Sequence, residues 1–187
     1  ISVTPDNISE EHICCGFSDK KCREGYLLKK ELIKDRYPEG FRFKKFNIRG
    51  KVFIEYVPAE YAWNPVSAPG YIFINCFWVS GKYKGHGYGK RLLQECIDEA
   101  TDKNGIVAIV GDKKRPFLSD KKFFLKQGFE ISDTCQPYFE LAVKKFKSDA
   151  PEPLFLKSTG QTILTDHPDG FVFFFSNQCT FTENYTQ

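Results

Sequence analysis

Three glycines that alternate with other residues mark the segment best suited to chemistry in this chain: Gly85, Gly87 and Gly89. Glycine adopts backbone angles that other residues avoid, and its missing side chain lets a ligand approach the backbone closely. A helix is predicted to begin directly afterwards, and the N–H groups at a helix N-terminus attract anions. Lys84 and Lys90 add positive charge. The segment therefore predicts a cradle for a phosphate-bearing group, with pyrophosphate as the natural guest.

The spacing of these glycines excludes two common phosphate-binding motifs. A Walker loop would need Gly at position 84 and Ser or Thr at position 91, where the chain has Lys84 and Arg91. A dinucleotide-binding loop would need G-x-G-x-x-G, whereas the chain has G-x-G-x-G. A purely structural glycine-rich turn stays open as the alternative. The later basic run Lys113–Arg115 could reach a further phosphate, but a solvated basic turn is the better interpretation.

A carboxylate inside an apolar segment is the candidate general base. Glu55 lies in the strand-like run Val52–Val57, which is predicted to neighbour a second strand at Tyr71–Val79. A primary amine has a pKa of about 10.4 and is mostly protonated at neutral pH, so a base would help it to react. The alternative is that Glu55 faces solvent on an ordinary alternating strand. Glu60 on the following loop is a weaker candidate.

The loop after this strand carries three aromatic residues, Tyr56, Tyr61 and Trp63. Beside Glu55 and Glu60 they would suit a cationic amine, because aromatic faces attract cations. The alternative is the packing of aromatic rings under a long loop.

Cysteine and histidine residues offer two further hypotheses. Cys76 precedes the glycine-rich segment and could take an acyl group covalently, although buried cysteine is usually a small apolar residue. His12, Cys14, Cys15 and Cys22 cluster in the sequence. Adjacent residues of a strand point to opposite faces, so Cys14 and Cys15 cannot easily share a zinc ion, and no metal site is predicted.

Hydrophobic periodicity predicts the elements that must position these residues. The expected order is a strand at His12–Phe17, a helix at Asp19–Arg36 after an N-cap at Ser18, strands at 41–43 and Val52–Val57 joined as a hairpin, a strand at Tyr71–Val79, a helix at 90–100, a strand at Ile106–Val110, a helix at Ser119–Gln127 and a strand at 139–143. This order predicts an α/β fold of the α+β type, with a mixed, mostly antiparallel sheet flanked by helices.

Composition excludes several classes of protein. Of 187 residues, 41% are hydrophobic and 27% are charged, which excludes a disordered chain. A net charge of +3 is too small to indicate nucleic acid as the main partner, and no apolar run is long enough to predict a membrane span. Neither a secretory signal nor a CxxC pair is visible, so we expect free thiols and a cytoplasmic location.

A change of composition after Phe146 predicts a domain boundary. The expected division is a first domain at 1–147, a linker at 148–155 and a partial C-terminal segment at 156–187. This last segment is too short to bury the apolar run Gly170–Ser176 by itself. The run either packs on the first domain or begins a second small α/β domain that continues past Gln187, and the second interpretation is favoured.

The pattern Val79-x-x-x-x-Lys84-Gly85-x-Gly87-x-Gly89 resembles the acetyl-CoA signature of the GNAT N-acyltransferases, with Lys84 where Arg or Gln is usual. Lys121–Phe129, which ends in Gly-Phe, resembles the next helix of that family. The order of elements agrees with the family over residues 10–146. The resemblance implies a GNAT-type sheet and an N-acetyltransferase.

The resemblance also implies a mechanism. An amine of a small molecule or peptide would attack acetyl-CoA, the co-substrate, directly. The pantetheine arm would pair with the strand end as an added strand does, and a backbone N–H near Val79 would face the oxyanion. The implied cofactor-binding residues are Phe77, Trp78, Val79, Lys84, Gly85, His86, Gly87, Tyr88, Gly89 and Lys90.

One residue departs from the family pattern. Many members carry Tyr four residues before the Gly-Phe pair, as the acid that protonates the leaving thiolate, and this chain has Phe124 there. The catalytic candidates are therefore Glu55 as the base and Ser119 or Tyr83 as the acid. If no acid is present, the thiolate leaves unaided or the domain only binds acyl-CoA.

Two other functions stay open: a non-catalytic acyl-CoA sensor, and a redox or interaction protein that acts through Cys179. Cys179 follows the apolar run and precedes a predicted helix, a setting that lowers the pKa of a thiol. This segment resembles a thioredoxin-like opening, with Thr182 in place of a second Cys, and the YoaP-like extension of some bacterial GNAT proteins. The sequence identifies neither the acceptor nor the oligomeric state, and a homodimer stays open.

Overall fold

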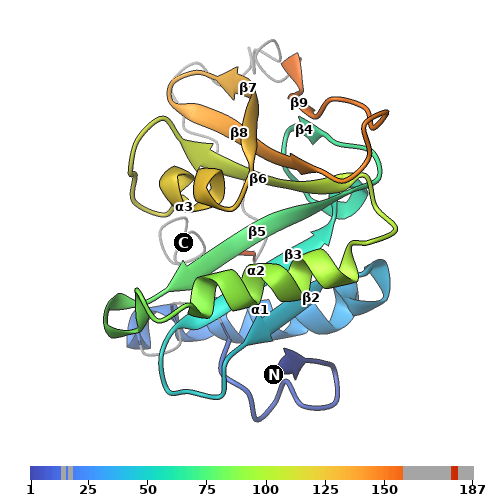
Figure 1. Ribbon diagram of the computed structural model, residues 1–187. Coiled ribbons are helices and arrows are strands. Elements are labelled where there is room, and N and C mark those ends of the chain that lie inside the picture. The colour runs from blue at the N-terminus through green and yellow to red at the C-terminus, as the bar shows by residue number, and fades with distance from the viewer. Residues whose placement is uncertain (14–15, 17–18, 158–177, 181–187) are drawn as a thin grey trace, which may run out of the picture.

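Seven strands form the sheet that organises the chain. The computed structural model describes residues 1–13, 16, 19–157 and 178–180. The strands of the sheet are β1 Ser2–Val3, β2 Arg42–Lys45, β3 Val52–Pro58, β5 Tyr71–Val79, β6 Gly105–Gly111, β7 Glu130–Cys135 and β8 Phe139–Lys145. They lie in the order β1-β2-β3-β5-β6-β8-β7 (Figure 1). Neighbours are antiparallel except β5 and β6, which confirms the predicted mixed, mostly antiparallel sheet.

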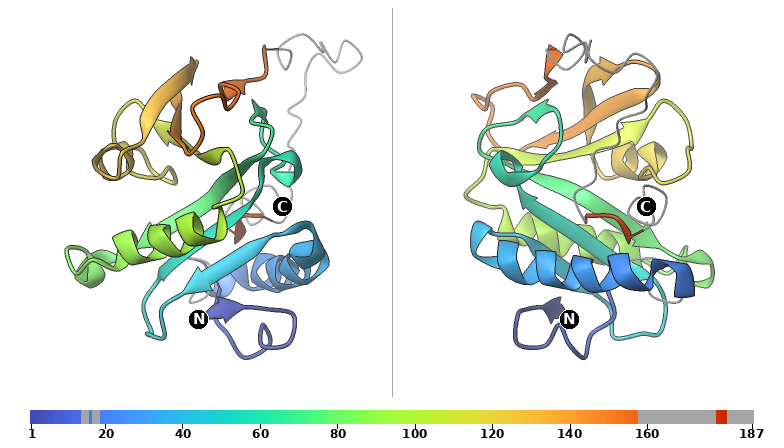
Figure 2. Two further views of the ribbon diagram at one scale, coloured as in Figure 1. Left: turned by 45° about the vertical axis from the view of Figure 1, so that its right-hand side comes forward. Right: turned by 180° about the vertical axis from the view of Figure 1, so that it is seen from behind.

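Helices cover both faces of the sheet. Figure 2 shows α1 (Arg23–Arg36) on one face, and α2 (Tyr88–Glu99) and α3 (Lys121–Lys126) on the other. Alternate residues of β3 enter two separate cores: Phe53 shares a core with Ile33 of α1, and Ile54 shares a core with Leu93 of α2. This alternation follows from the two-residue period of a strand. We call the two sides the α1 face and the α2 face.

The strands β5 and β6 separate halfway along β5. Their pairing covers residues 71–74 of β5 and 105–108 of β6, while β5 continues to Val79. In the described part of the chain, residues 75–79 of β5 therefore have no strand partner on the β6 side.

A β-bulge lies where the two strands separate. Glu55 of β3 is opposite Cys76, whereas the next residue, Tyr56, is opposite Ile74. Asn75 is consequently an extra residue in β5, and such an insertion bends the strand that carries it. The bulge explains why β5 turns away from β6 at this point.

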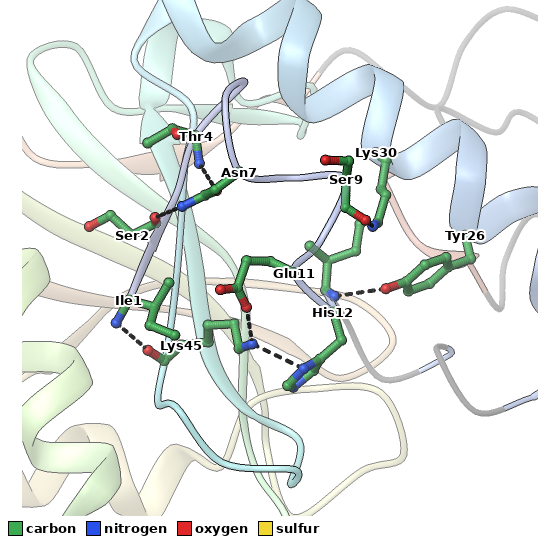
Figure 3. A network of polar contacts seen from close by, with 11 residues as sticks. Ile1, Ser2, Thr4, Asn7, Ser9, Glu11, His12, Tyr26, Lys30 and Lys45 are labelled. Atoms are coloured by element: carbon green, nitrogen blue, oxygen red, sulfur yellow. Dashed lines mark hydrogen bonds and ion pairs between the residues drawn. The ribbon is translucent and has the colours of Figure 1, made fainter.

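The first strand does not lie where the sequence predicted it. The prediction of a strand at His12–Phe17 is wrong for the described residues of that range, and Ser2–Val3 pairs with β2 instead. The N-terminal ammonium donates to the carbonyl of Lys45 at 2.7 Å, and Lys45 Nζ contacts Glu11 and His12 Nδ1 (Figure 3). A two-residue strand held by such contacts is too short to show hydrophobic periodicity.

The segment predicted as a linker lies against the sheet. β9 (Leu154–Phe155) pairs with β4 (Val66–Ser67). The Tyr71 hydroxyl donates to the carbonyl of Pro151 at 2.8 Å, and the Ser132 hydroxyl donates to that of Pro153 at 3.0 Å. The side chain of Phe155 is buried. Contacts at Pro151, Pro153 and Phe155 thus hold this segment against the sheet.

Most remaining elements agree with the sequence prediction. A 3₁₀ turn, η2 (Lys20–Cys22), capped by Asp19, leads into α1, and the predicted N-cap Ser18 lies outside the described residues. The sequence pattern missed β7, because its half-exposed edge position needs little apolar character. The predicted run 170–176 and Thr182 also lie outside the described residues. No helix among the described residues is long and apolar enough to cross a bilayer.

Two phenylalanines allow a test of the α2-face core. Phe124 is fully buried, and its ring packs against Phe77, Phe123 and Phe129. Phe124→Ala should lower the free energy of unfolding by about 3–5 kcal/mol, because it removes transfer energy and leaves a cavity. Phe117 is 73% exposed, so Phe117→Ala should change it by no more than about 0.5 kcal/mol. Urea unfolding of both variants measures the difference, and equal losses would contradict this packing.

Candidate functional site

A cavity of about 660 Å³ opens beside the unpaired end of β5. Its walls come from β5, the loop that leads into α2, the first turn of α2 and the loop between β6 and α3. The lining residues are 77–79, 83–85, 87–90, 114–120 and 123. Its volume and its mixture of apolar and basic side chains suit a cofactor-sized molecule that carries negative charge.

Backbone amides form the base of this cavity. Gly85 and Gly87 have φ angles of 81° and 77°, in the left-handed region that favours glycine, and a Cβ on either would meet nothing within 4 Å. The N–H of Arg91 donates to the carbonyl of Gly87 and is the first helical bond of α2. Within the described chain, the preceding N–H groups at 88–90 donate to no protein acceptor. N–H groups without an acceptor at a helix N-terminus attract anions, so this geometry is the one that the predicted cradle requires.

The third glycine has a different role. A Cβ on Gly89 would lie 3.2 Å from the rings of Phe77 and Phe123, closer than side chains ordinarily pack. These rings stack on each other with centroids 4.9 Å apart. Gly89 therefore lets the first turn of α2 approach the aromatic wall of the cavity.

Basic side chains surround the cradle from two sides. Lys84 and Lys90 lie beside the glycines, while Lys114 and Arg115 line the cavity from the β6–α3 loop. Arg115 bonds Asp112, with its Nε 3.0 Å from the carboxylate, so part of its charge is compensated. Lys114 is exposed, as the interpretation of a solvated basic turn expects, and the loop between β6 and α3 also brings it to the lining of the cavity.

Most of the cofactor-binding and catalytic candidates from the sequence analysis line the same cavity. They are Phe77, Trp78, Val79, Tyr83, Lys84, Gly85, Gly87, Tyr88, Gly89, Lys90 and Ser119. His86 is exposed on the loop and is not among the lining residues. Glu55 is also separate, because it lies on the other face of the sheet.

The two candidate acids lie at different places along the cavity. Ser119 forms a parallel bridge with Val110 of β6, close to where β5 and β6 separate. The Tyr83 ring lies against Gly50 in the turn between β2 and β3, where a Cβ would overlap it, and it also packs near Tyr88. Phe124 is buried behind the cavity wall, and the neighbouring ring that lines the cavity is Phe123.

Glu55 is buried rather than solvent-facing. Its carboxylate is 1% exposed, and its Oε2 lies 2.5 Å from Lys29 Nζ of α1. Burial raises the pKa of Glu55, while the charges of Lys29 and Arg36 oppose that rise. The alternative of an exposed strand residue is therefore wrong for Glu55. Because burial and the neighbouring cations shift its pKa in opposite directions, small changes around this carboxylate can change its protonation state.

Lys29 was missed by the sequence analysis. It lies on the helix face that also buries Gly25 and Ile33, so its position in the helical period was apolar. A lysine at such a position is rarely fully buried without a partner. A lysine at an apolar position of the helix could therefore have indicated a buried ion pair, but the sequence could not show which carboxylate Lys29 would contact.

The aromatic loop does not reach this site. Pro58 at the end of β3 is opposite Ile72, whereas the cavity lies at the Val79 end of β5, about 20 Å of strand away. Trp63 packs over the guanidinium of Arg36 at 4.1 Å instead. The charge of Arg36 acts in turn on Glu55, so the hypothesis that this loop serves a cationic amine beside Glu55 and Glu60 stays a prediction.

The cysteine and histidine hypotheses gain no support from the geometry. Within the described residues no group of three His, Cys, Asp or Glu side chains could hold a metal ion, and Cys14 and Cys15 lie outside those residues. Burial and the charge of Lys45 lower the pKa of His12. Cys76 is half-buried on the α1 face, opposite the cavity.

Comparison with known proteins gives consistent similarities. The model of the Acetyltransferase (GNAT) family matches residues 8–129. YoaP of Bacillus subtilis, described as an uncharacterized N-acetyltransferase, is 42% identical over 183 residues, which cover 97% of this chain and 72% of that protein.

Two solved structures have a similar arrangement. An acetyltransferase from Thermus thermophilus has a TM-score of 0.50 at 16% identity, covering 77% of this chain and 94% of that one. A GNAT family acetyltransferase from Brucella melitensis, solved in complex with acetyl-CoA, has a TM-score of 0.48 at 15% identity, covering 81% and 90%. At these identities the first similarity supports the fold alone.

Adjacent lysines test the charge of the cavity. Both Lys113 and Lys114 are exposed, but only Lys114 lines the cavity. Lys114→Ala should weaken the binding of inorganic pyrophosphate about two- to fivefold, as expected for one partly solvated charge, and Lys113→Ala should leave it unchanged. The rise of the thermal unfolding midpoint with pyrophosphate concentration measures both, because a ligand of the native state stabilises it. The same rise in both variants would contradict the placement of Lys114.

Proposed function

Because the chain belongs to the GNAT family of acetyltransferases, we propose that it moves the acetyl group of acetyl-CoA onto a primary amine of a small molecule or peptide by direct attack. Family membership makes the protein an acyltransferase with acetyl-CoA as its co-substrate. The observation that carries the proposal is a single cavity that combines unpaired helix amides with the open edge of β5.

The cavity residues fit the two ends of acetyl-CoA. The N–H groups at 88–90, with the charges of Lys84 and Lys90, bind the diphosphate. The open edge at 75–79 of β5 bonds the amides of the pantetheine arm as an added strand would. The ring of Phe123 provides an apolar wall for this arm. The thioester would then lie towards the bulge, where β5 and β6 separate.

Glu55 is the base of the proposed reaction. It lies at the bulge on the α1 face, so an amine that approaches the thioester from this face meets it. Lys29 Nζ lies 2.5 Å from Oε2, and Asn75 at the bulge also acts on the carboxylate, which would accept the proton of the amine. Burial raises the pKa of Glu55, which makes its carboxylate a stronger base. Holding the two reactants on opposite faces of one opening lowers the barrier further.

Ser119 is the better-placed acid for the leaving thiolate. Its bridge to Val110 holds it where β6 separates from β5, whereas Tyr83 lies at the cradle end of the cavity. Phe124 has no proton to donate and is buried away from the cavity. We assign Tyr83 to the wall around the phosphates and Ser119 to proton transfer.

The proposed acetyltransferase domain comprises residues 1–147. The contacts of 148–155 with the sheet support a strap along this domain rather than a free linker. Residues 156–187 would then comprise the proposed C-terminal segment.

Release of the CoA thiol tests the reaction class. The full chain is incubated with acetyl-CoA and a panel comprising a polyamine, an arylalkylamine, an amino acid and a lysine-containing peptide. Thiol release that depends on one of these amines supports the proposal. Tight binding of acetyl-CoA without thiol release for any of them would overturn it.

Gly87→Val tests the cradle. Valine at a φ of 77° is strained, and its side chain would occupy the open space above the amides. We expect at least about a tenfold loss of acetyl-CoA affinity by calorimetry, equal to about 1.4 kcal/mol. Gly81→Val is the control, because a Cβ at Gly81 also meets nothing within 4 Å but Gly81 has no positive φ and does not line the cavity. Equal affinities of the two variants would contradict the site.

Glu55→Gln tests the base. We expect kcat to fall at least about a hundredfold with an unchanged KM for acetyl-CoA, because Glu55 lies on the opposite face. In the parent chain, kcat/KM should fall as the pH drops through a Glu55 pKa above its ordinary value of 4.5, and this limb should vanish in the variant. The double variant Lys29→Met/Glu55→Gln removes both buried charges and separates lost stability from a lost base. An unchanged pH profile would argue against Glu55.

A further inference from the structure

The short segment Gln178–Thr180 lies on the α1 face, next to Glu55. Lys29 Nζ donates to the carbonyl of Gln178 at 2.5 Å, across 149 positions of sequence, while it contacts Glu55 Oε2. The side chain of Thr180 is 1% exposed. The view from behind in Figure 2 shows this segment, in red, on the side of the sheet that carries α1. Lys29 therefore joins the C-terminal part of the chain to the candidate base.

The packing around Thr180 is tight. A Cβ on Gly16 would overlap the hydroxyl of Thr180 and would lie 3.1 Å from its Cβ. The same Cβ would lie 3.3 Å from the Cβ of Cys22, at the start of α1. Burial raises the pKa of Cys22, and the nearby groups Asp19 and Cys179 add to this rise. The segment that leads into α1 and the segment at Thr180 thus meet at Gly16, and only glycine leaves room for Thr180.

This packing lies on the side from which an acceptor would approach. The cavity for acetyl-CoA is on the α2 face, and Glu55 is on the α1 face at the bulge. The backbone of Gln178 contacts the same ammonium as Glu55, so the segment lies within one side chain's reach of the carboxylate. Glu55 is only 1% exposed in this arrangement. An amine that reaches Glu55 must pass or contact the segment.

We infer that Gln178–Thr180 form a cover over the acceptor site and set the affinity for the amine, with Lys29 as the positioning residue that holds the cover beside Glu55. The inference rests on the proposed function, because it takes the α1 face as the acceptor side. Gln178–Thr180 would thus determine the specificity for the amine, although these residues do not line the cofactor cavity.

A pair of substitutions tests the cover without touching Lys29 or Glu55. Gly16→Ala creates the overlap with the Thr180 hydroxyl. Gly16→Ala/Thr180→Ala removes this overlap and leaves the contact of 3.1 Å with the Cβ at position 180, which needs only a small shift. Peptide-resolved alkylation of Cys179, which is half-buried, reports release of the segment, with the exposed Cys135 as the internal reference. Steady-state kinetics with acetyl-CoA and the most active amine of the panel give both KM values.

We expect Gly16→Ala to raise the Cys179 alkylation rate at least about fivefold and to change the KM for the amine at least about threefold, equal to about 0.65 kcal/mol. The KM for acetyl-CoA should stay within about twofold, equal to about 0.4 kcal/mol. The double variant should restore both values, which a merely misfolded protein would not do. Unchanged Cys179 alkylation overturns the inference, and so does release with an unchanged KM for the amine. Failure of the proposed function would instead appear as the absence of thiol release in the parent chain.

Discussion

The separation of β5 from β6 at Asn75 is the constraint on which the rest of the structure depends. A parallel pair needs a crossover, and α2 supplies it, so the glycine-rich loop and the helix N-terminus must follow the C-terminal end of β5. The bulge then turns that end away from β6. Backbone groups that lose a strand partner require other partners. An extended, amide-bearing ligand that enters the cavity beside this end of β5 could provide them.

The two faces of the opening use different chemistry. On the α2 face, the proposed recognition of acetyl-CoA depends on backbone N–H groups next to Gly85 and Gly87, which have left-handed angles. On the α1 face, the proposed chemistry depends on the charged pair of Lys29 and Glu55. Taking two charges out of water costs several kcal/mol for each, and their attraction repays this only with good geometry. Such a pair is weak as a source of stability, so its placement at the bulge favours a chemical role.

The C-terminal part of the described chain is integrated with this arrangement. Residues 148–155 lie along the sheet, and Gln178 contacts the same ammonium as Glu55. These contacts join residues that are far apart in sequence. Gln178 therefore contacts the buried ionic pair of Lys29 and Glu55, and the proposed acceptor side includes residues beyond 147.

Local patterns in the sequence predicted the glycine-rich turn, the order of most elements and the mixed sheet. They could do so because glycine backbone angles, helix starts and the two-residue period of a strand each depend on only a few neighbouring residues. The tertiary structure alone decided which groups meet. It paired Glu55 with Lys29, brought Lys114 to the cavity, buried Phe124 behind Phe123 and assigned the first strand to Ser2–Val3. Each of these outcomes depends on strand register or on contacts between distant segments. The preferences of single residues carry no information about contacts between distant segments. The same side chain can be exposed or buried, depending on which segment packs over it.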